Sequence, residues 1–310
     1  INSGNANWGD GNNSPAQGSV DNGLVIKDSD NNEWVWIPVE ASTLSNMYVT
    51  STKTDGEGFY GNSSVTTKIY TNTTTIGREG DTVTISRDTP GTTGWREPDL
   101  IVFDQREAYY KTILEFEDAQ STAEAFSRDY ANMIASIQKY GGFYIGRYEL
   151  SNEGVQKDKE SLTNINWYYL YKKCKSLNAS EKVESRMIYS IQWDLACDFI
   201  SKKGEQKSIT DSRSWGNYND SISPANKGNY EKASNTASKK KNTGSNEAWK
   251  ANNIYDLAGN CWELCQEAFM NGNRVGRGST YSNSGLSGPV SSIGSYFAEQ
   301  GLSLIHISEP

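Results

Sequence analysis

Apolar positions at the start of the chain follow the short period of β-structure. Apolar runs at 24–27 and 34–39 flank a polar stretch, 28–32, of Asp, Ser and Asn. Such turn residues between two short apolar runs predict a β-hairpin. Residues 41–100 are rich in Thr, Gly and Asn and alternate only weakly, which predicts loops with short edge strands.

Apolar positions with helical spacing begin further along the chain. Residues 105–140 predict a helix, because large apolar side chains recur every three or four positions, and the glycines at 141–142 would end it. The sequence 143–149 follows immediately as a predicted strand. The apolar positions on this first helix are Phe126, Tyr130, Met133, Ile134 and Ile137.

Two more helices are predicted with the same spacing. One runs from about 166 to 177, with Thr163 or Asn164 as its N-cap. The other runs from 192 to 203 and ends at Gly204.

Polar stretches divide the chain. Residues 1–22 are rich in Asn, Gly and Ser and predict a disordered linker. The polar loop 204–248 is long, and such loops in compact domains are usually functional. We therefore expect a linker at 1–22, a hairpin-and-helix extension at 23–140 and a core domain at 141–301.

Composition narrows the function classes. The chain has 310 residues, 9 Trp and 18 Tyr, enough to bury an aromatic core. Its net charge is −8, and Lys239–Lys241 is the only basic cluster, which argues against nucleic-acid binding. No run of 18 apolar residues is present, so we expect no membrane insertion.

Three motifs carry a family resemblance. Residues 253–264 read Asn-Ile-Tyr-Asp-Leu-Ala-Gly-Asn-Cys-Trp-Glu-Leu, residues 274–279 read Arg-Val-Gly-Arg-Gly-Ser, and residues 143–149 read Phe-Tyr-Ile-Gly-Arg-Tyr-Glu. Together they resemble the formylglycine-generating-enzyme-like (sulfatase-modifying factor) branch of the C-type-lectin fold. The resemblance implies an α+β core with twisted antiparallel sheets, two core helices and much irregular loop.

The family that the chain resembles contains members with two kinds of function. The oxidase members carry a cysteine pair soon after the second motif, and here no cysteine follows Arg277. The variable proteins of diversity-generating retroelements instead use this segment as a display surface, whose Asn codons mutate at adenines. The chain resembles these proteins most, because residues 276–296 are dominated by residue types that such codons reach, and antibody loops use similar types.

The resemblance therefore implies a ligand-binding surface within 276–296. Its expected residues are Gly276, Thr280, Tyr281, Ser282, Asn283, Ser284, Ser287, Gly288, Ser292, Ile293, Ser295 and Tyr296. The expected scaffold residues are Trp262 as a core aromatic, Arg274, Arg277 with its guanidinium bound to carboxylate or carbonyl oxygens, and Gly278.

A structural calcium ion is also implied. In the oxidase branch, the Asn and Glu of the first motif contribute oxygen ligands to Ca²⁺, and these correspond to Asn260 and Glu263. The alternative is that Asn260 caps a turn and Glu263 hydrogen-bonds Arg274 or Arg277. No other cofactor is expected.

The cysteines and the single histidine bear on catalysis. Cys174 and Cys197 lie on apolar helix faces, which predicts buried side chains, and Cys261 and Cys265 are the only conceivable redox pair. Residues 302–310 resemble a translated sequencing adapter, so we expect a truncated metagenomic chain with a foreign tail. Because His306 lies in that tail, the native chain would have no histidine for catalysis or metal binding.

We accordingly expect a non-catalytic display protein that binds a protein or glycan target on a cell surface, as in a phage receptor-binding tip or a bacterial surface protein. Such proteins are often homo-oligomers, and we expect a virion or bacterial cell-surface location. Two rivals stay open: an oxidoreductase of the formylglycine-generating type, and a structural virion protein without a specific ligand.

Overall fold

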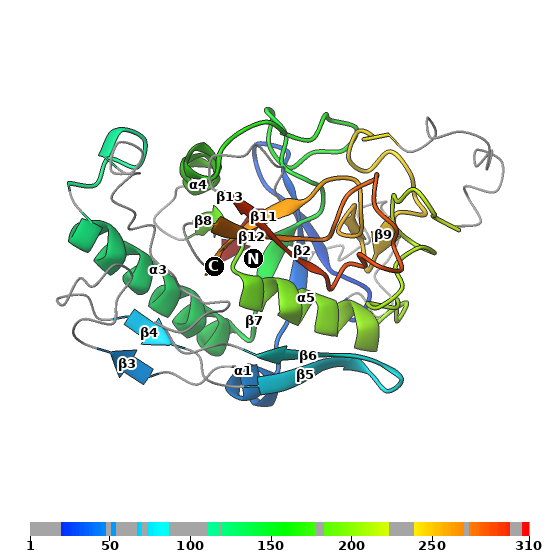
Figure 1. Ribbon diagram of the computed structural model, residues 1–310, viewed down its shortest axis with the longest axis horizontal. Coiled ribbons are helices and arrows are strands. Elements are labelled where there is room, and N and C mark those ends of the chain that lie inside the picture. The colour runs from blue at the N-terminus through cyan, green and yellow to red at the C-terminus, as the bar shows by residue number, and fades with distance from the viewer. Residues whose placement is uncertain are drawn as a thin grey trace.

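The computed structural model describes residues 20–47, 51–53, 67–69, 73–86, 111–117, 119–177, 183–222, 239–269, 273–297 and 306–309. Within these residues the chain is α+β, with helices beside small antiparallel sheets (Figure 1). The helices are α1 (Ala41–Met47), α3 (Ala119–Tyr140), α4 (Trp167–Ser176) and α5 (Ser190–Lys202).

The largest sheet has five strands. Its order is β1 (Val25–Lys27), β2 (Glu33–Pro38), β7 (Gly142–Gly146), β14 (His306–Glu309) and β8 (Glu184–Met187). A three-stranded sheet contains β11 (Glu263–Phe269), β12 (Asn273–Arg277) and β13 (Ile293–Phe297). The two-stranded pairs are β3 (Ser51–Lys53) with β4 (Thr67–Ile69), β5 (Thr73–Arg78) with β6 (Asp81–Ser86), and β9 (Lys250–Ala251) with β10 (Ile254–Tyr255).

The predicted hairpin is confirmed. Strands β1 and β2 pair antiparallel, with Ile26 opposite Trp34. Asp28 organises the connecting turn, because its carboxylate accepts hydrogen bonds from the backbone N–H groups of Asp30 and Asn32, each at 2.9 Å. Strand β2 then pairs with β7, which places the predicted strand at 143–149 at the centre of the sheet.

The predicted helices are present with shifted boundaries. Helix α3 begins at Ala119, later than the predicted start at 105, and residues 105–110 lie outside the described chain. The helix ends as predicted before Gly141, whose φ is +75°. The predicted N-cap of α4 is wrong. Asn166 caps that helix, because its side-chain oxygen accepts from the Tyr169 N–H at 3.1 Å. Helix α5 starts at Ser190, two residues before the predicted start.

Two apolar clusters form the core. The first includes Val35 and Ile145 of the five-stranded sheet and Leu195 and Phe199 of α5. The second surrounds α4, where Trp167 stacks on Tyr171 at a ring-centroid distance of 5.2 Å. Aromatic side chains therefore provide much of the buried area, as the composition predicts.

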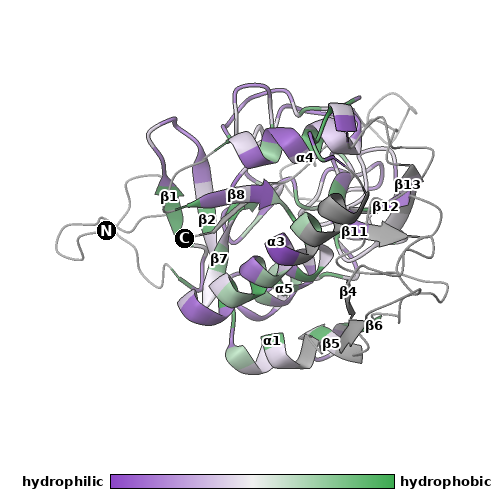
Figure 2. Cartoon of the chain, turned by 90° about the vertical axis from the view of Figure 1, so that its left-hand side faces the viewer, coloured by the Kyte–Doolittle hydropathy of each residue, from purple (hydrophilic) through white to green (hydrophobic). Residues whose placement is uncertain are grey.

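Strand β8 is buried yet polar, and it is purple in Figure 2. Arg186 is almost fully buried there, and its guanidinium donates to the backbone carbonyl of Asp129 at 2.9 Å. This contact ties β8 to α3, and α3 also packs against β7.

Three sequence predictions concern the ends and the loops. Of the expected linker 1–22, only residues 20–22 lie within the described chain, where they form a turn. The described parts of 204–248 contain no helix or strand. The segment set apart as a foreign tail contributes β14, which pairs with β7 and β8. A strand can fill this position whatever side chains it carries, because the pairing uses backbone groups.

Candidate functional site

The expected ligand-binding segment is an irregular loop between two paired strands. Residues 279–292, here called the display segment, connect β12 to β13 (orange to red in Figure 1). The strands below it are in register, with Gly276 opposite Gly294 and Arg274 opposite Tyr296. The expected residues at 276, 293, 295 and 296 therefore lie on strands, and the others lie on the loop.

A second loop supports the backbone of the display segment. Residues 208–222, here called the cradle loop, run beside it and bond to it at several points. The Ser212 N–H donates to the Gly285 carbonyl, and the Asn219 N–H donates to the Asn283 carbonyl, both at 3.0 Å. Because these bonds use main-chain groups of the display segment, they persist when its side chains differ.

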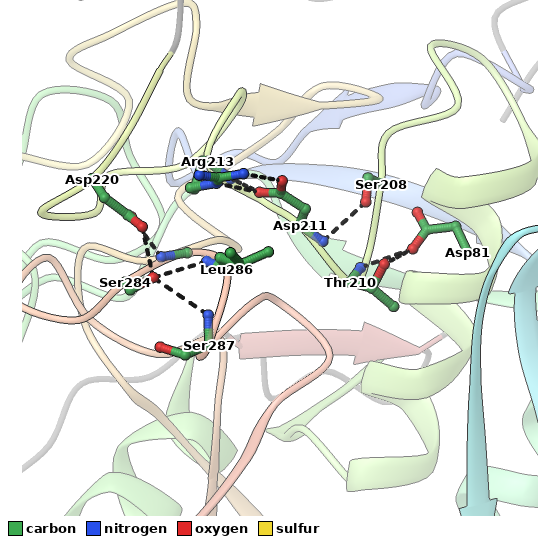
Figure 3. A network of polar contacts seen from close by, with 10 residues as sticks. Asp81, Ser208, Thr210, Asp211, Arg213, Asp220, Ser284, Leu286 and Ser287 are labelled. Atoms are coloured by element: carbon green, nitrogen blue, oxygen red, sulfur yellow. Dashed lines mark hydrogen bonds and ion pairs between the residues drawn. The ribbon is translucent and has the colours of Figure 1, made fainter.

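The most strongly bonded part of this contact is a turn at residues 284–287 (Figure 3). The Asp220 carboxylate accepts from the Ser284 hydroxyl at 2.6 Å and from the Gly285 N–H at 2.7 Å. The Ser284 oxygen in turn accepts from the Leu286 and Ser287 N–H groups at 3.2 and 3.3 Å. Sequence analysis did not find Asp220, which is 64 residues from Ser284.

The expected ligand-binding residues differ in exposure. Those with exposed side chains are Ser282, Ser287 and Ile293. Those that are half-buried are Thr280, Tyr281, Asn283, Ser284, Gly288, Ser292 and Tyr296, whereas Gly276 is buried. The side chain of Ser295 lies outside the description. Leu286 is 53% exposed at the tip of the turn, and the sequence analysis did not include it among the ligand-binding residues.

An aromatic pair lies beside the display segment. The rings of Trp262 and Tyr296 have centroids 5.3 Å apart. A side chain at Gly276 would meet both rings, at 2.8 Å from Tyr296 and 3.4 Å from Trp262. Trp262 is half-buried, so it is not the core aromatic that the sequence predicts. Burial raises the pKa of Tyr296 to about 12.

The two scaffold arginines are buried and bonded. Arg277 donates to the Asp194 carboxylate at 2.5 Å and to the Ser190 hydroxyl at 2.9 Å, so α5 is tied to the end of β12. Arg274 donates to the Gln266 carbonyl at 2.7 Å, and its guanidinium lies 4.4 Å from the Trp167 ring centroid. Both therefore anchor the strand that leads into the display segment.

Gly278 stands at the base of the display segment and cannot carry a side chain without strain. Its φ is +78°, and a Cβ there would overlap the Glu263 carboxylate and lie 2.8 Å from the Leu257 carbonyl oxygen. Its own carbonyl accepts from the Gly259 N–H at 2.8 Å and from the Tyr218 hydroxyl at 3.1 Å. The close approach fixes the path of the backbone at this point.

Three carboxyl groups, Glu149, Asp256 and Glu263, are buried below this glycine. Burial, followed by the charge of Asp256, raises the pKa of Glu149 to about 8. Burial raises the pKa of Asp256 to about 7, and burial with the charge of Glu149 raises that of Glu263 well above its usual range. When these groups are ionised, Glu149 Oε1, Asp256 Oδ1 and both Glu263 oxygens accept no hydrogen bond. The Glu149 and Glu263 carboxyl groups lie close enough to share a hydrogen bond when one of them is protonated.

Asn260 joins the loops around these carboxyl groups. Its side-chain oxygen accepts from the Asn217 amide and the Lys241 N–H, each at 2.9 Å, and its amide nitrogen donates to Glu149 at 2.6 Å. Its backbone carbonyl accepts from the Thr280 hydroxyl and from a display-segment N–H, each at 3.1 Å. The backbone is left-handed here, with φ of 58°, which Asn tolerates better than most residues.

The two expected calcium ligands, Asn260 and Glu263, differ in whether their oxygens are free to bind a cation. The Asn260 oxygen already accepts two hydrogen bonds, so it is not a free donor. The Glu263 carboxyl is buried beside that of Glu149, and carboxylate oxygens are the hard donors that Ca²⁺ prefers. The alternative bond from Glu263 to Arg274 or Arg277 is absent. Within the described chain, no group of three or more His, Cys, Asp or Glu is arranged to hold a metal.

The cysteines are four separate buried thiols. Cys174 and Cys197 are fully buried, as predicted from their apolar helix faces. Cys261 and Cys265, the only conceivable redox pair, are not bonded to each other. Burial raises the pKa of the Cys261 thiol, and nearby Glu149 raises it further, so the reactive thiolate is disfavoured.

Comparison with known proteins found no match: no family model, no curated protein and no solved structure matches the chain. Across the described residues, no helix is both long and apolar enough to cross a bilayer.

Proposed function

We propose that the chain is a C-type-lectin-like domain of the formylglycine-generating-enzyme type, and that it is a non-catalytic display protein. The order of elements supports the fold: β7 is followed by α4, β8 and α5, then by the β9–β10 pair and a three-stranded sheet. The first motif runs from β10 to the start of β11, and the second lies on β12 and the two residues after it. The display segment is the irregular loop of that sheet, and its function is to present side chains to a target.

One observation carries this proposal: the backbone of the display segment is bonded to its surroundings while several of its side chains face solvent. Main-chain groups at 283 and 285 bond to the cradle loop, and residues 282, 286, 287 and 293 are exposed. A fixed backbone with free side chains lets the surface change without loss of the fold. Ordering such a loop in advance also lowers the entropic cost of binding.

The thiols favour binding over the oxidoreductase alternative. Copper or oxygen chemistry of the formylglycine-generating type needs an accessible thiolate. Cys261 is 5% exposed and Cys265 is fully buried, and burial keeps the Cys261 thiol protonated. Neither cysteine lies in the display segment.

Calcium is the cation we propose for the buried carboxyl groups, with a structural role. Glu263 would be its principal ligand, because its carboxyl is fully buried beside that of Glu149 and the two supply hard oxygen donors. The ion would neutralise charge that the surrounding groups leave uncompensated. Asn260 would act beside it, by fixing Glu149 and the two flanking loops.

The proposed target is a protein or glycan on a cell surface, and the proposed location is a virion or a bacterial surface. A homo-oligomer would suit this role, because several copies acting together offset weak binding at each site.

A cell-adsorption experiment tests the proposal. The fluorescently labelled chain is incubated with a panel of Gram-positive and Gram-negative cells, and with the variant Ser282→Asp, Leu286→Asp, Ser287→Asp. We expect saturable adsorption to some cells and its loss in the variant. A matched variant with three exposed residues elsewhere replaced by aspartate, Tyr140→Asp, Asn152→Asp and Tyr169→Asp, has the same net charge and should adsorb as the parent does. Adsorption that survives the first variant, or copper-dependent oxygen consumption by the reduced chain, would contradict the proposal.

A further inference from the structure

The Asp220 side chain lies directly beside the exposed turn of the display segment (Figure 3). Its two oxygens take separate partners: Oδ2 accepts from the Ser284 hydroxyl at 2.6 Å and Oδ1 accepts from the Gly285 N–H at 2.7 Å. Both are short bonds to a carboxylate, and such charge-assisted bonds are about twice as strong as neutral ones. Asp220 therefore bonds to the turn through one side chain and one main-chain group.

Ser284 uses its single oxygen atom for two purposes. The hydroxyl donates to Asp220 and accepts from the N–H groups of Leu286 and Ser287. A hydroxyl can donate and accept at one atom, whereas an ionised carboxylate only accepts and an apolar side chain does neither. The Ser284 carbonyl also accepts from the Gly288 N–H at 2.8 Å, which closes the turn. Serine and threonine are the residues that suit this position.

The neighbouring contacts place no such demand on side chains. The Asn219 amide donates to the Ser282 carbonyl at 2.7 Å, and the Asn219 N–H donates to the Asn283 carbonyl. Both acceptors are main-chain oxygens. The Ser282 side chain is exposed, as are those of Leu286 and Ser287.

The loop that carries Asp220 is itself braced. Arg213 forms a two-point ion pair with Asp211, with nitrogen–oxygen distances of 2.8 and 2.6 Å. The start of the loop is fixed by Asp81 at the head of β6. Its carboxylate accepts from the Thr210 N–H at 3.2 Å (Figure 3) and from the Ile209 N–H at 3.0 Å. The β5–β6 hairpin of the N-terminal extension thus supports the loop from the opposite side.

We propose that Asp220 sets the conformation of the display segment through Ser284, so that position 284 is an anchor restricted to hydroxyl residues, while positions 282, 286 and 287 contact the target. This assignment rests on the proposed display function. It divides the surface into one residue that fixes the turn and three residues that contact the target. It places Ser284 outside the ligand-contacting set that the sequence predicts, and it adds Leu286 to that set. Asp220 is a positioning residue, because it acts through Ser284.

A folding selection without any target tests the assignment. The full chain is displayed on yeast with positions 282, 284, 286 and 287 randomised, and cells are sorted for resistance to thermolysin. Loss of a hydrogen bond to a charged group costs enough stability that we expect Ser and Thr at 284 to be enriched about tenfold over Ala. At the other three positions we expect no residue class to be enriched by more than about twofold.

The same library in two further backgrounds separates the role of Asp220 from a purely local role of Ser284. In Asp220→Ala we expect the preference at 284 to fall below about threefold, because the acceptor is gone. In Glu205→Ala, which removes an exposed carboxylate that pairs with Lys207 and not with the display segment, we expect the preference to remain. Equal tolerance at all four positions in the parent, or an unchanged preference in Asp220→Ala, would overturn the proposal. Because no target takes part, failure here is distinct from failure of the display function.

Discussion

Replacing Gly278 by alanine tests whether the base of the display segment is fixed by close packing. Gly278 has a φ of +78°, and the new Cβ would overlap the Glu263 carboxylate and lie 2.8 Å from the Leu257 carbonyl oxygen and 3.0 Å from the Trp193 ring. The left-handed conformation alone costs an L-residue about 1–2 kcal/mol. Overpacking in a closed site adds about 1–3 kcal/mol. We therefore expect Gly278→Ala to destabilise the chain by about 2–5 kcal/mol.

Two glycines provide a control for the backbone part of that cost. Gly80 and Gly141 have φ of +79° and +75°, and a Cβ at either would meet no atom within 4 Å. Their alanine variants should therefore lose only about 1–2 kcal/mol, since strain is present without overlap.

Guanidinium-chloride unfolding, followed by Trp fluorescence and near-UV circular dichroism, measures the difference between the three variants. The free energy of unfolding should fall at least about 1 kcal/mol further in Gly278→Ala than in either control. If all three variants lose the same amount, the close approach of Glu263 to the backbone does not exist, and the account of the scaffold at this point is wrong.

Three further predictions concern the buried charges. Arg277→Met should lower the free energy of unfolding in urea by about 3–5 kcal/mol, because it leaves the Asp194 carboxylate buried without its partner. The double variant Arg277→Met with Asp194→Leu should recover most of that loss. A double variant as unstable as the sum of the two single variants would contradict this. In EGTA, stability should fall as pH rises from about 4.5 to about 8, because burial raises the pKa of Glu149 to about 8 and that of Asp256 to about 7, so the folded chain keeps protons that the unfolded chain releases. Glu149→Gln should make this fall smaller without removing it, because Asp256 and Glu263 are also buried, and an unchanged profile would refute the assignment. Calcium at a hundredfold excess over its Kd should stabilise the chain by about 2.7 kcal/mol and raise its Tm, with no shift in Glu263→Gln; a parent Tm that does not respond would sink the cation proposal.

The sequence predicts local structure here better than it predicts contacts. The hairpin around Asp28 and the end of α3 at Gly141 follow from turn and capping chemistry within a few residues. The N-cap of α4 was misplaced because several polar residues precede the helix and only geometry decides which one bonds; Asn164 instead adopts a left-handed φ of 59°.

The candidate site depends on pairings that spacing cannot reveal. Asp220 and Ser284 are 64 residues apart, and Asn260 and Glu149 are 111 apart. The motif at 253–264 draws attention to Asn260, yet its role in joining loops becomes visible only when the loops are in place. Trp262 was expected in the core and is half-buried beside Tyr296, because glycines at 276 and 294 leave room for the rings.

If the display function is right, residues 276–296 vary apart from the scaffold positions 277 and 278, and the rest of the chain stays constant. Sequencing the genomic region that encodes this chain in many independent isolates tests that claim most directly. We predict differences confined to adenines of codons within 276–296, with codons 220, 277 and 278 constant, beside a near-identical template repeat and a reverse-transcriptase gene. Variation spread evenly along the gene, without such a repeat, would contradict the account.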